Sequence, residues 1–227
     1  MIYLVVGFIG ALLMFCGDML LYYDPNDFNY KAGDNSETKI NAIIEVMGKV
    51  SPKRLYAGGF IGPVAAFLYC VGFYHIIFIS DENVKGVAIA AFLLSCLGII
   101  AGGAYHSHCT YLGLLAKDKY REARNIVMRY FQKMILVVYI AEGIGFLLLA
   151  GIIVTGNSIL PRWAVLASPL FLMLLKPLVV RLPKGVRVIV SGGWSNLISV
   201  IYNPEIYAFS NYWLSINTST RSQPSFS

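Results

Sequence analysis

The chain has 227 residues, of which 57% are hydrophobic and 13% are charged, and its net charge is +6. Soluble domains carry about 25% charged residues, so this composition indicates a protein whose solvent is a lipid bilayer. The positive charge does not indicate a nucleic-acid partner, because the basic residues lie at the edges of long apolar runs. The composition therefore predicts an integral membrane protein.

Six apolar stretches predict transmembrane helices, because about 20 apolar residues are needed to cross the ~30 Å hydrocarbon core. The stretches do not alternate between polar and apolar residues, which disfavours a membrane β-barrel. The predicted spans are 2–22, 55–79, 86–115, 134–155, 162–180 and 186–202. We expect an all-α, polytopic membrane helix bundle of about six transmembrane helices, with one domain at 1–205 and an interfacial or flexible tail at 206–227.

The fifth and sixth spans contain residues that interrupt helices. Pro169 and Pro177 lie in the fifth span, with Lys176 near its end. The sixth contains Ser-Gly-Gly-Trp-Ser-Asn at 191–196, which predicts a broken or kinked helix whose backbone lines a cavity. Two alternatives stay open for the sixth span: it stops before Pro204, or it continues through the aromatic stretch EIYAFSNYWL.

The distribution of Lys and Arg predicts the orientation. Segments 24–54, 116–133 and 176–187 hold all the basic residues except Lys85, Arg162 and Arg221. The positive-inside rule places these segments in the cytoplasm, so that the N-terminus of this cell-membrane protein lies outside. Both termini are then outside, unless the sixth span fails to cross.

Two of the basic segments have helical patterns. In residues 34–49, Asp34 and Glu37 have the spacing of a capping box, and apolar residues follow on one face. In residues 118–133, apolar residues recur at three- and four-residue steps between cations. This second pattern fits an interfacial helix with its cations toward lipid phosphates, and equally a solvated extension of the fourth span.

Glycines four residues apart occur in the second and third spans, at Gly58 and Gly62 and at Gly98 and Gly102. Such spacing lets helix backbones approach closely. We interpret it as packing within the chain rather than a dimer interface, and the oligomeric state stays open. The sequence Gly62–Pro63 should also kink the second helix.

Polar side chains inside the apolar runs are the strongest functional signal, because a charge at the bilayer centre costs at least about 2.5–3.5 kcal/mol. Counting about 1.5 Å per residue from the cytoplasmic ends places them in one half of the membrane. The candidate pocket residues are Asp18, Arg54, His106, His108, Glu142, Trp194 and Asn196. We therefore predict an intramembrane pocket open to the cytoplasm or the inner leaflet.

Each candidate has a functional and a structural interpretation. Arg54 could hold an anionic head group, or it could pair with Asp18 and lock two helices. His106 and Glu142 could move protons, because a buried carboxyl beside a histidine suits a proton relay. Either histidine alone could instead form an interhelical hydrogen bond. No nucleophile-elbow sequence surrounds the serines, so no catalytic residue is assigned.

The sequence does not predict a metal site or a particular cofactor. His75 lies near the outer end of its helix, roughly 20 Å from the other histidines. His106 and His108 are two residues apart, so they point to different faces of a straight helix. A site that combines one histidine with Cys109, Asp18 and Glu142 matches no zinc pattern. The four cysteines lack CxxC spacing and are expected to be free thiols.

The segments GDMLLYY, RLYAGGFIGP, AGGAYHSH and SGGWSNL resemble an uncharacterised bacterial family of multi-pass membrane proteins, a domain of unknown function, over residues 10–200. The resemblance implies no established activity. Three hypotheses follow from the residues: a pocket for a small or lipid-like ligand, a proton-coupled small-molecule transporter, and a non-catalytic membrane scaffold.

Overall fold

The structure is a computed structural model that describes residues 2–23, 36–117, 121–179 and 181–203. The described residues are helical, apart from turns and an isolated antiparallel bridge between Ser80 and Ser158. The elements are α1 (Ile2–Tyr22), α2 (Ser36–Lys49), α3 (Pro52–Phe73), α4 (His75–Ile79), η1 (Glu82–Val84), α5 (Lys85–Lys117), α6 (Arg121–Thr155), η2 (Arg162–Ala167), α7 (Pro169–Leu174), α8 (Lys176–Val179) and α9 (Lys184–Gly192), followed by helical residues 194–203. The predicted all-α fold is confirmed.

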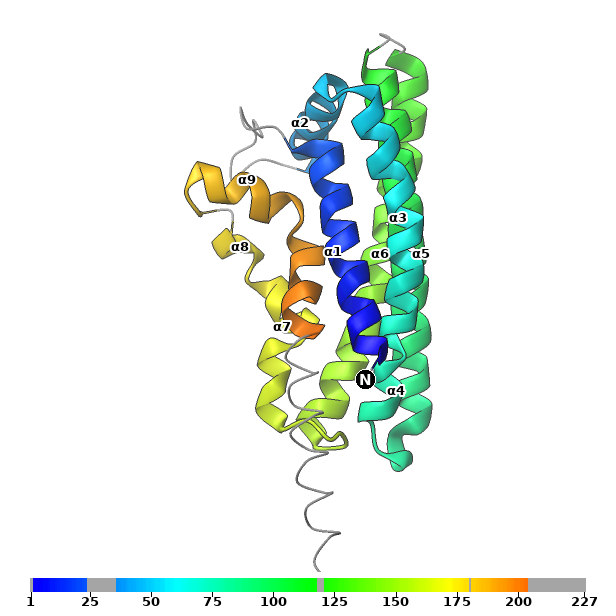
Figure 1. Cartoon of the computed structure of the whole chain (residues 1–227), viewed down its shortest axis with the longest axis vertical. Helices are drawn as coiled ribbons and strands as arrows, with labels where there is room; N and C mark the ends of the chain where they lie inside the picture. Colours follow the sequence, from blue (N-terminus) through cyan, green and yellow to red (C-terminus); the bar gives the residue numbers. More distant parts are fainter. Residues whose placement is uncertain (1, 24–35, 118–120, 180, 204–227) are drawn as a thin grey trace, which may run out of the picture.

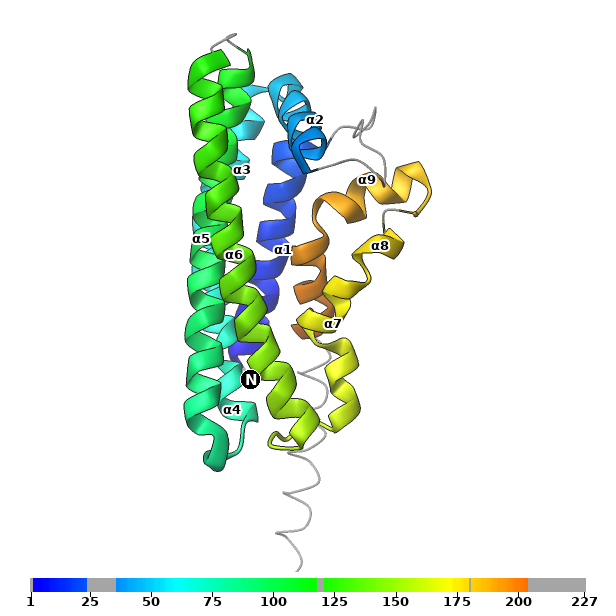
Figure 2. The same ribbon diagram turned by 180° about the vertical axis from the view of Figure 1, so that it is seen from behind.

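Four segments are long and apolar enough to cross a membrane: Ile2–Tyr22, Pro52–Ile79, Glu82–Lys117 and Glu122–Thr155. They stand side by side in Figures 1 and 2, with α1 against α3, α3 against α5, and α5 against α6. In the described part of the chain, no comparable packing joins α1 to α6. The long helices therefore form an open row rather than a closed four-helix bundle.

The outward faces of the long helices are apolar. Phe60 and Phe67 on α3 are 78% and 68% exposed, and Leu93 on α5 and Leu147 on α6 are also largely exposed. Soluble monomers rarely expose apolar patches of this extent. These faces are compatible with lipid around the row of helices.

Glycines bring the long helices close together. A Cβ on Gly72 of α3 would lie 2.5 Å from the Cα of Gly7 on α1, and one on Gly62 would lie 2.8 Å from the carbonyl oxygen of Gly103 on α5. Gly98 likewise packs against Glu142 of α6. The predicted glycines thus pack against neighbouring helices within the chain, except Gly102, where a Cβ would meet only Cδ1 of Ile99, at 3.9 Å.

The structure differs from the sequence prediction in the fifth and sixth spans. Residues 162–203 form several short helices instead of two continuous ones, and within the described residues only the four long segments meet the criteria for a membrane span. Pro169 begins α7 after the Ser168 cap, and Pro177 lies within the short α8. The predicted break in 191–196 is confirmed, because α9 ends at Gly192 and residues 194–203 form a new helix.

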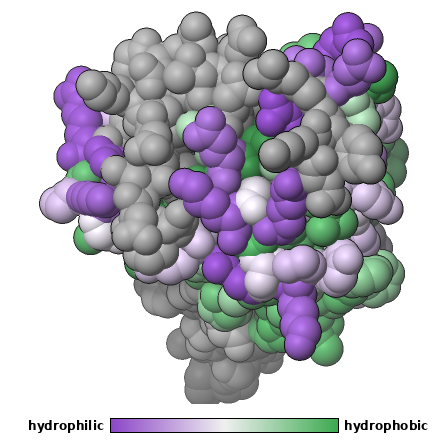
Figure 3. All heavy atoms as spheres, turned by 90° about the horizontal axis from the view of Figure 1, so that it is seen from above, coloured by the Kyte–Doolittle hydropathy of each residue, from purple (hydrophilic) through white to green (hydrophobic). Residues whose placement is uncertain are grey.

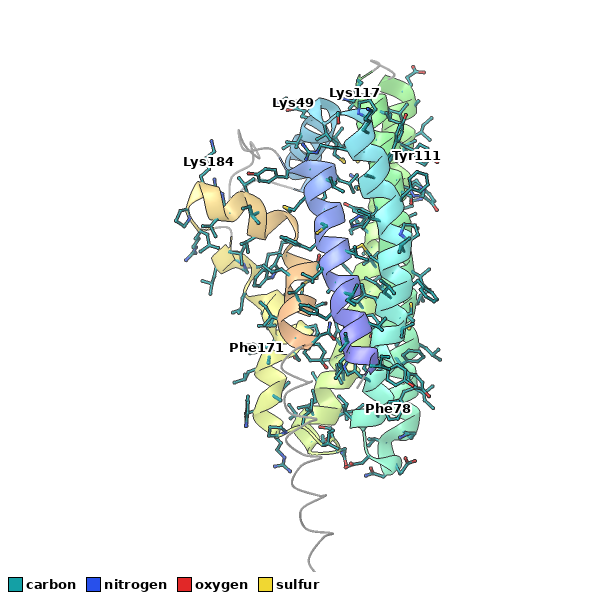
Figure 4. All side chains as sticks on the ribbon, in the orientation of Figure 1. Lys49, Phe78, Tyr111, Lys117, Phe171 and Lys184 are labelled. Carbon is teal, nitrogen blue, oxygen red and sulfur yellow. The ribbon has the colours of Figure 1, made fainter. Side chains whose placement is uncertain are left out.

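One described residue from each of the three predicted cytoplasmic segments can be placed at the same end of the molecule. Lys49, Lys117 and Lys184 all lie at this end in Figure 4, and Figure 3 shows patches of hydrophilic side chains among the described residues there. Helix α6 runs without interruption from Arg121, which supports the helical-extension interpretation of 118–133. Helix α2 packs on α5, and its first turn begins at Ser36, so the capping role predicted for Asp34 lies outside the described residues.

Candidate functional site

A cavity of about 210 Å³ lies where the segment after η2 packs across the row of long helices. It includes side chains from α1, α3, α5 and α6, from α7 and α8, and from the break after α9. Five of the predicted pocket residues line it: Asp18, His106, Glu142, Trp194 and Asn196. The cavity therefore brings together polar groups from α1, α5, α6 and the helix at 194–203.

Asp18 is the centre of a hydrogen-bond network on the cavity wall. Its carboxyl group is buried, with Oδ2 accepting from Nδ2 of Asn196 at 2.7 Å and Oδ1 lying 3.2 Å from Nε2 of His106. The hydroxyl of Tyr22 also contacts Oδ1, and it lies 2.8 Å from the carbonyl oxygen of Gly192. The network joins α1 to α5 and to both sides of the break at Gly193.

Local sequence explains how this break fits against α1. A Cβ on Gly193 would lie 2.4 Å from Cδ2 of Phe15, so a larger residue could not approach α1 without displacing that ring. The last carbonyls of α9 have no partner further along the helix, and the Tyr22 hydroxyl contacts that of Gly192. The small residue and the tyrosine together hold the broken helix beside Asp18.

Aromatic side chains line the cavity next to the network. The Tyr69 hydroxyl donates to Oδ1 of Asn196 at 3.2 Å. The Tyr69 ring lies 5.6 Å from that of Phe73, which lies 6.0 Å from the ring of Phe146 on α6. These rings form a continuous apolar wall from the polar network to α6.

Glu142 has a different environment from Asp18. It is partly buried and lines the cavity from α6. No hydrogen bond or ion pair joins its carboxyl group to another residue in the ranges that the structure describes. In particular, His106 faces Asp18, so the structure does not form the His106–Glu142 contact on which the predicted proton relay depends.

Three buried side-chain polar atoms lack a partner in the described part of the chain: Oγ of Ser95, Nδ1 of His106 and Nε1 of Trp194. Of these three residues, Trp194 and His106 line the cavity and Ser95 does not. Nδ1 of His106 lies on the side of Gly17, where a Cβ would be 3.2 Å away. An indole N–H can only donate, so a ligand with an acceptor group would satisfy Trp194.

Arg54 and His108 do not line the cavity. The Arg54 guanidinium donates to the carbonyl oxygens of Met19 at 2.9 Å and Tyr23 at 3.1 Å. It therefore caps the C-terminal end of α1, where cations are favoured. His108 contacts the carbonyl oxygen of Ala104 at 2.8 Å, and its ring lies 5.2 Å from that of Tyr130. The orientation of α5 about its own axis, which the depth of a residue does not predict, points His108 away from the cavity.

His75 is also separate from the cavity. Its Nδ1 lies 2.7 Å from the carbonyl oxygen of Gly72, and its Nε2 lies 3.1 Å from the hydroxyl of Tyr202. Among the described residues, no group of three or more His, Cys, Asp or Glu side chains could hold a metal ion.

Sequence reasoning missed several cavity residues, among them Tyr22, Tyr69, Tyr139 and Lys176. Helical spacing could have indicated two of them, because Tyr22 lies four residues after Asp18 and Tyr139 three residues before Glu142. Lys176 is exposed at the start of α8, and it also lines the cavity.

Comparison with known families supports the resemblance found in the sequence. Residues 1–202 match the family described as a family of unknown function, DUF6796. The chain belongs to this family. No curated protein and no solved structure matches the chain. Membership of DUF6796 thus covers the long helices and nearly all of the helix at 194–203, and it supplies no activity.

Proposed function

We propose that this membrane protein binds a small or lipid-like ligand in the cavity between its row of long helices and the segment 162–203. The observation that carries the proposal is the Glu142 carboxyl group, which lines the cavity without a partner in the described chain. An ionisable group without a partner at membrane depth is expensive and is more often functional than structural. The unpaired indole N–H of Trp194 supports the same proposal.

The position of the polar groups supports access from the end that carries the basic segments. By the positive-inside rule this end faces the cytoplasm. Lys176 also lines the cavity and is exposed on α8. A ligand would then enter from the cytoplasm or the inner leaflet.

A scaffold without a ligand is the second candidate, and the Asp18 network favours it. Asp18 contacts Asn196 and His106 on other helices, as expected of an interhelical tie. The two candidates differ in Glu142, which a scaffold does not need.

The test is native mass spectrometry of the full chain released from mild detergent, comparing wild type with Glu142→Gln. Glu82→Gln is the matched control, because Glu82 is exposed and pairs only with Lys85 among the described residues. We expect a defined adduct on the wild type and the control, and its loss from Glu142→Gln. A bare polypeptide mass in all three proteins, with lower heat stability of Glu142→Gln, would favour the scaffold.

A further inference from the structure

The face of α6 that carries Glu142 is aromatic as well as acidic. Tyr139 lies three residues before Glu142 and Phe146 four residues after it, so both share its helix face. All three residues line the cavity. Along α6, Glu142 therefore lies between two aromatic residues of the cavity lining, each about one helical turn away.

The opposite wall extends this aromatic surface. Phe73 of α3 meets Phe146 edge to face at 6.0 Å, and Tyr69 lies next to Phe73. The faces of aromatic rings attract cations, and the attraction is stronger where water is excluded. A carboxylate beside several rings is a suitable environment for an ammonium group.

The charges around the cavity also favour a cation. Two carboxyl groups line it, at Asp18 and Glu142, whereas Lys176 is its one ammonium among the described residues. Asp18 already accepts from Asn196 and contacts His106, but no ion pair links Lys176 to either carboxyl group in the described ranges. An anionic ligand would add a third negative group, while a monocation would balance Glu142.

We propose that the cavity selects a protonated organic amine, with its ammonium on the Glu142 carboxylate and its apolar body against the rings of Phe73 and Phe146. This inference rests on the proposed function, because it names the class of ligand for the same cavity. In this proposal Asp18 holds the helices of the cavity wall together, and Glu142 binds the ammonium group of the ligand.

The test compares two probes of the same shape, benzylamine and benzyl alcohol, by calorimetric titration of the full chain in a non-ionic detergent at neutral pH. A detergent blank corrects for partitioning. We expect wild type to bind benzylamine at least about tenfold more tightly than benzyl alcohol, a ratio equivalent to about 1.4 kcal/mol. Glu142→Gln should bind the two probes equally, and Glu142→Asp should keep a preference for the amine.

Controls separate recognition from folding. Glu82→Gln changes an exposed carboxyl group outside the cavity and should keep the full preference. Phe146→Leu removes one ring while keeping an apolar side chain, and it should lower amine affinity several-fold with less effect on the alcohol. Equal binding of both probes by wild type, binding of neither, or an undiminished preference in Glu142→Gln would overturn the proposal.

The two experiments together distinguish failure of the amine proposal from failure of the proposed ligand-binding function. An adduct in native mass spectra without amine preference would reject the amine and leave the binding role in place. Absence of both an adduct and probe binding would reject both.

Discussion

At the scale of single residues, two carboxyl groups in apolar helices have opposite environments. Asp18 is buried and meets donors from Asn196, His106 and Tyr22. Glu142 faces the cavity without such a partner in the described chain. Buried polar groups are stable when they are paired, which is consistent with a structural role for Asp18 and with the ligand-binding role that we propose for Glu142.

Asp18→Ala should destabilise the protein, because it removes the acceptor that joins α1 to α5 and to the helix at 194–203. Single interhelical hydrogen bonds in membranes contribute about 0.6 kcal/mol, and unpaired buried groups cost about 1–3 kcal/mol. We expect a loss of about 1–3 kcal/mol in thermal unfolding followed in detergent. Glu82→Ala, on the exposed pair with Lys85, should change stability by less than about 0.5 kcal/mol. Equal effects of the two substitutions would contradict the network.

Arg54→Gln should weaken the end of α1 and leave the cavity intact, because the guanidinium donates to Met19 and Tyr23 and does not line the cavity. We expect a decrease in stability of about 0.3–1 kcal/mol, typical of a charge at a helix terminus. The adduct in native mass spectra should persist. Lys53→Gln is the matched control on the neighbouring exposed residue. Loss of the adduct in Arg54→Gln but not in Lys53→Gln would show that Arg54 contributes to ligand binding, against this account.

At the scale of elements, close approach of glycines positions the helices that form the cavity. The contact between Gly7 and Gly72 leaves no room for a side chain, whereas a Cβ on Gly151 of α6 would meet nothing within 4 Å. Two glycines in long helices thus differ only in their surroundings.

Gly72→Ala should therefore destabilise the protein by about 1–3 kcal/mol, because the new Cβ forces α1 away from α3. Gly151→Ala should be neutral or should stabilise by up to about 1 kcal/mol, since alanine is the better helix former. Thermal unfolding of both variants in the same detergent measures the difference. A destabilisation by Gly151→Ala as large as that by Gly72→Ala would contradict the packing.

At the scale of the whole molecule, the cavity exists because the long helices form an open row. The contacts place α1 and α6 at its two ends, because α1 packs on α3, α3 on α5 and α5 on α6. The short helices of 162–203 lie to one side of the long helices in Figures 1 and 2. Asn196 bonds to α1 and α3, while α7 contacts α6. The C-terminal segment therefore supplies one wall of the site.

Hydropathy predicts the four long helices, because the length of an apolar run is set by the thickness of the bilayer. The depth of each residue along its predicted span correctly groups Asp18, His106 and Asn196, which lie within hydrogen-bond distance of one another through Asp18. The depth of a residue in the membrane does not show which way its helix is rotated. The predicted pocket therefore wrongly includes His108, whose ring lies beside that of Tyr130. The predicted pocket also wrongly includes Arg54, whose long side chain donates to a carbonyl oxygen at the end of α1. The folding back of 162–203 depends on packing against the row, which no local pattern encodes.

The arrangement of the basic segments predicts which positions share one side of the membrane. Single cysteines at Lys49, Lys117 and Lys184 should react with an impermeant maleimide from the same side of sealed vesicles, and a cysteine at Lys85 from the other. Figure 4 places the first three at one end of the molecule. By the positive-inside rule their side is the cytoplasm. Labelling of all four from one side would contradict the orientation.

The central claim, that a ligand occupies the cavity, is tested most directly by filling it. Gly102 lines the cavity, and a Cβ there would meet only Cδ1 of Ile99, at 3.9 Å. Native mass spectrometry of Gly102→Leu should show a folded protein without the adduct of the wild type. The matched variant Gly151→Leu, on an open surface of α6, should keep it. An adduct retained in Gly102→Leu, or absent from the wild type, would contradict the claim.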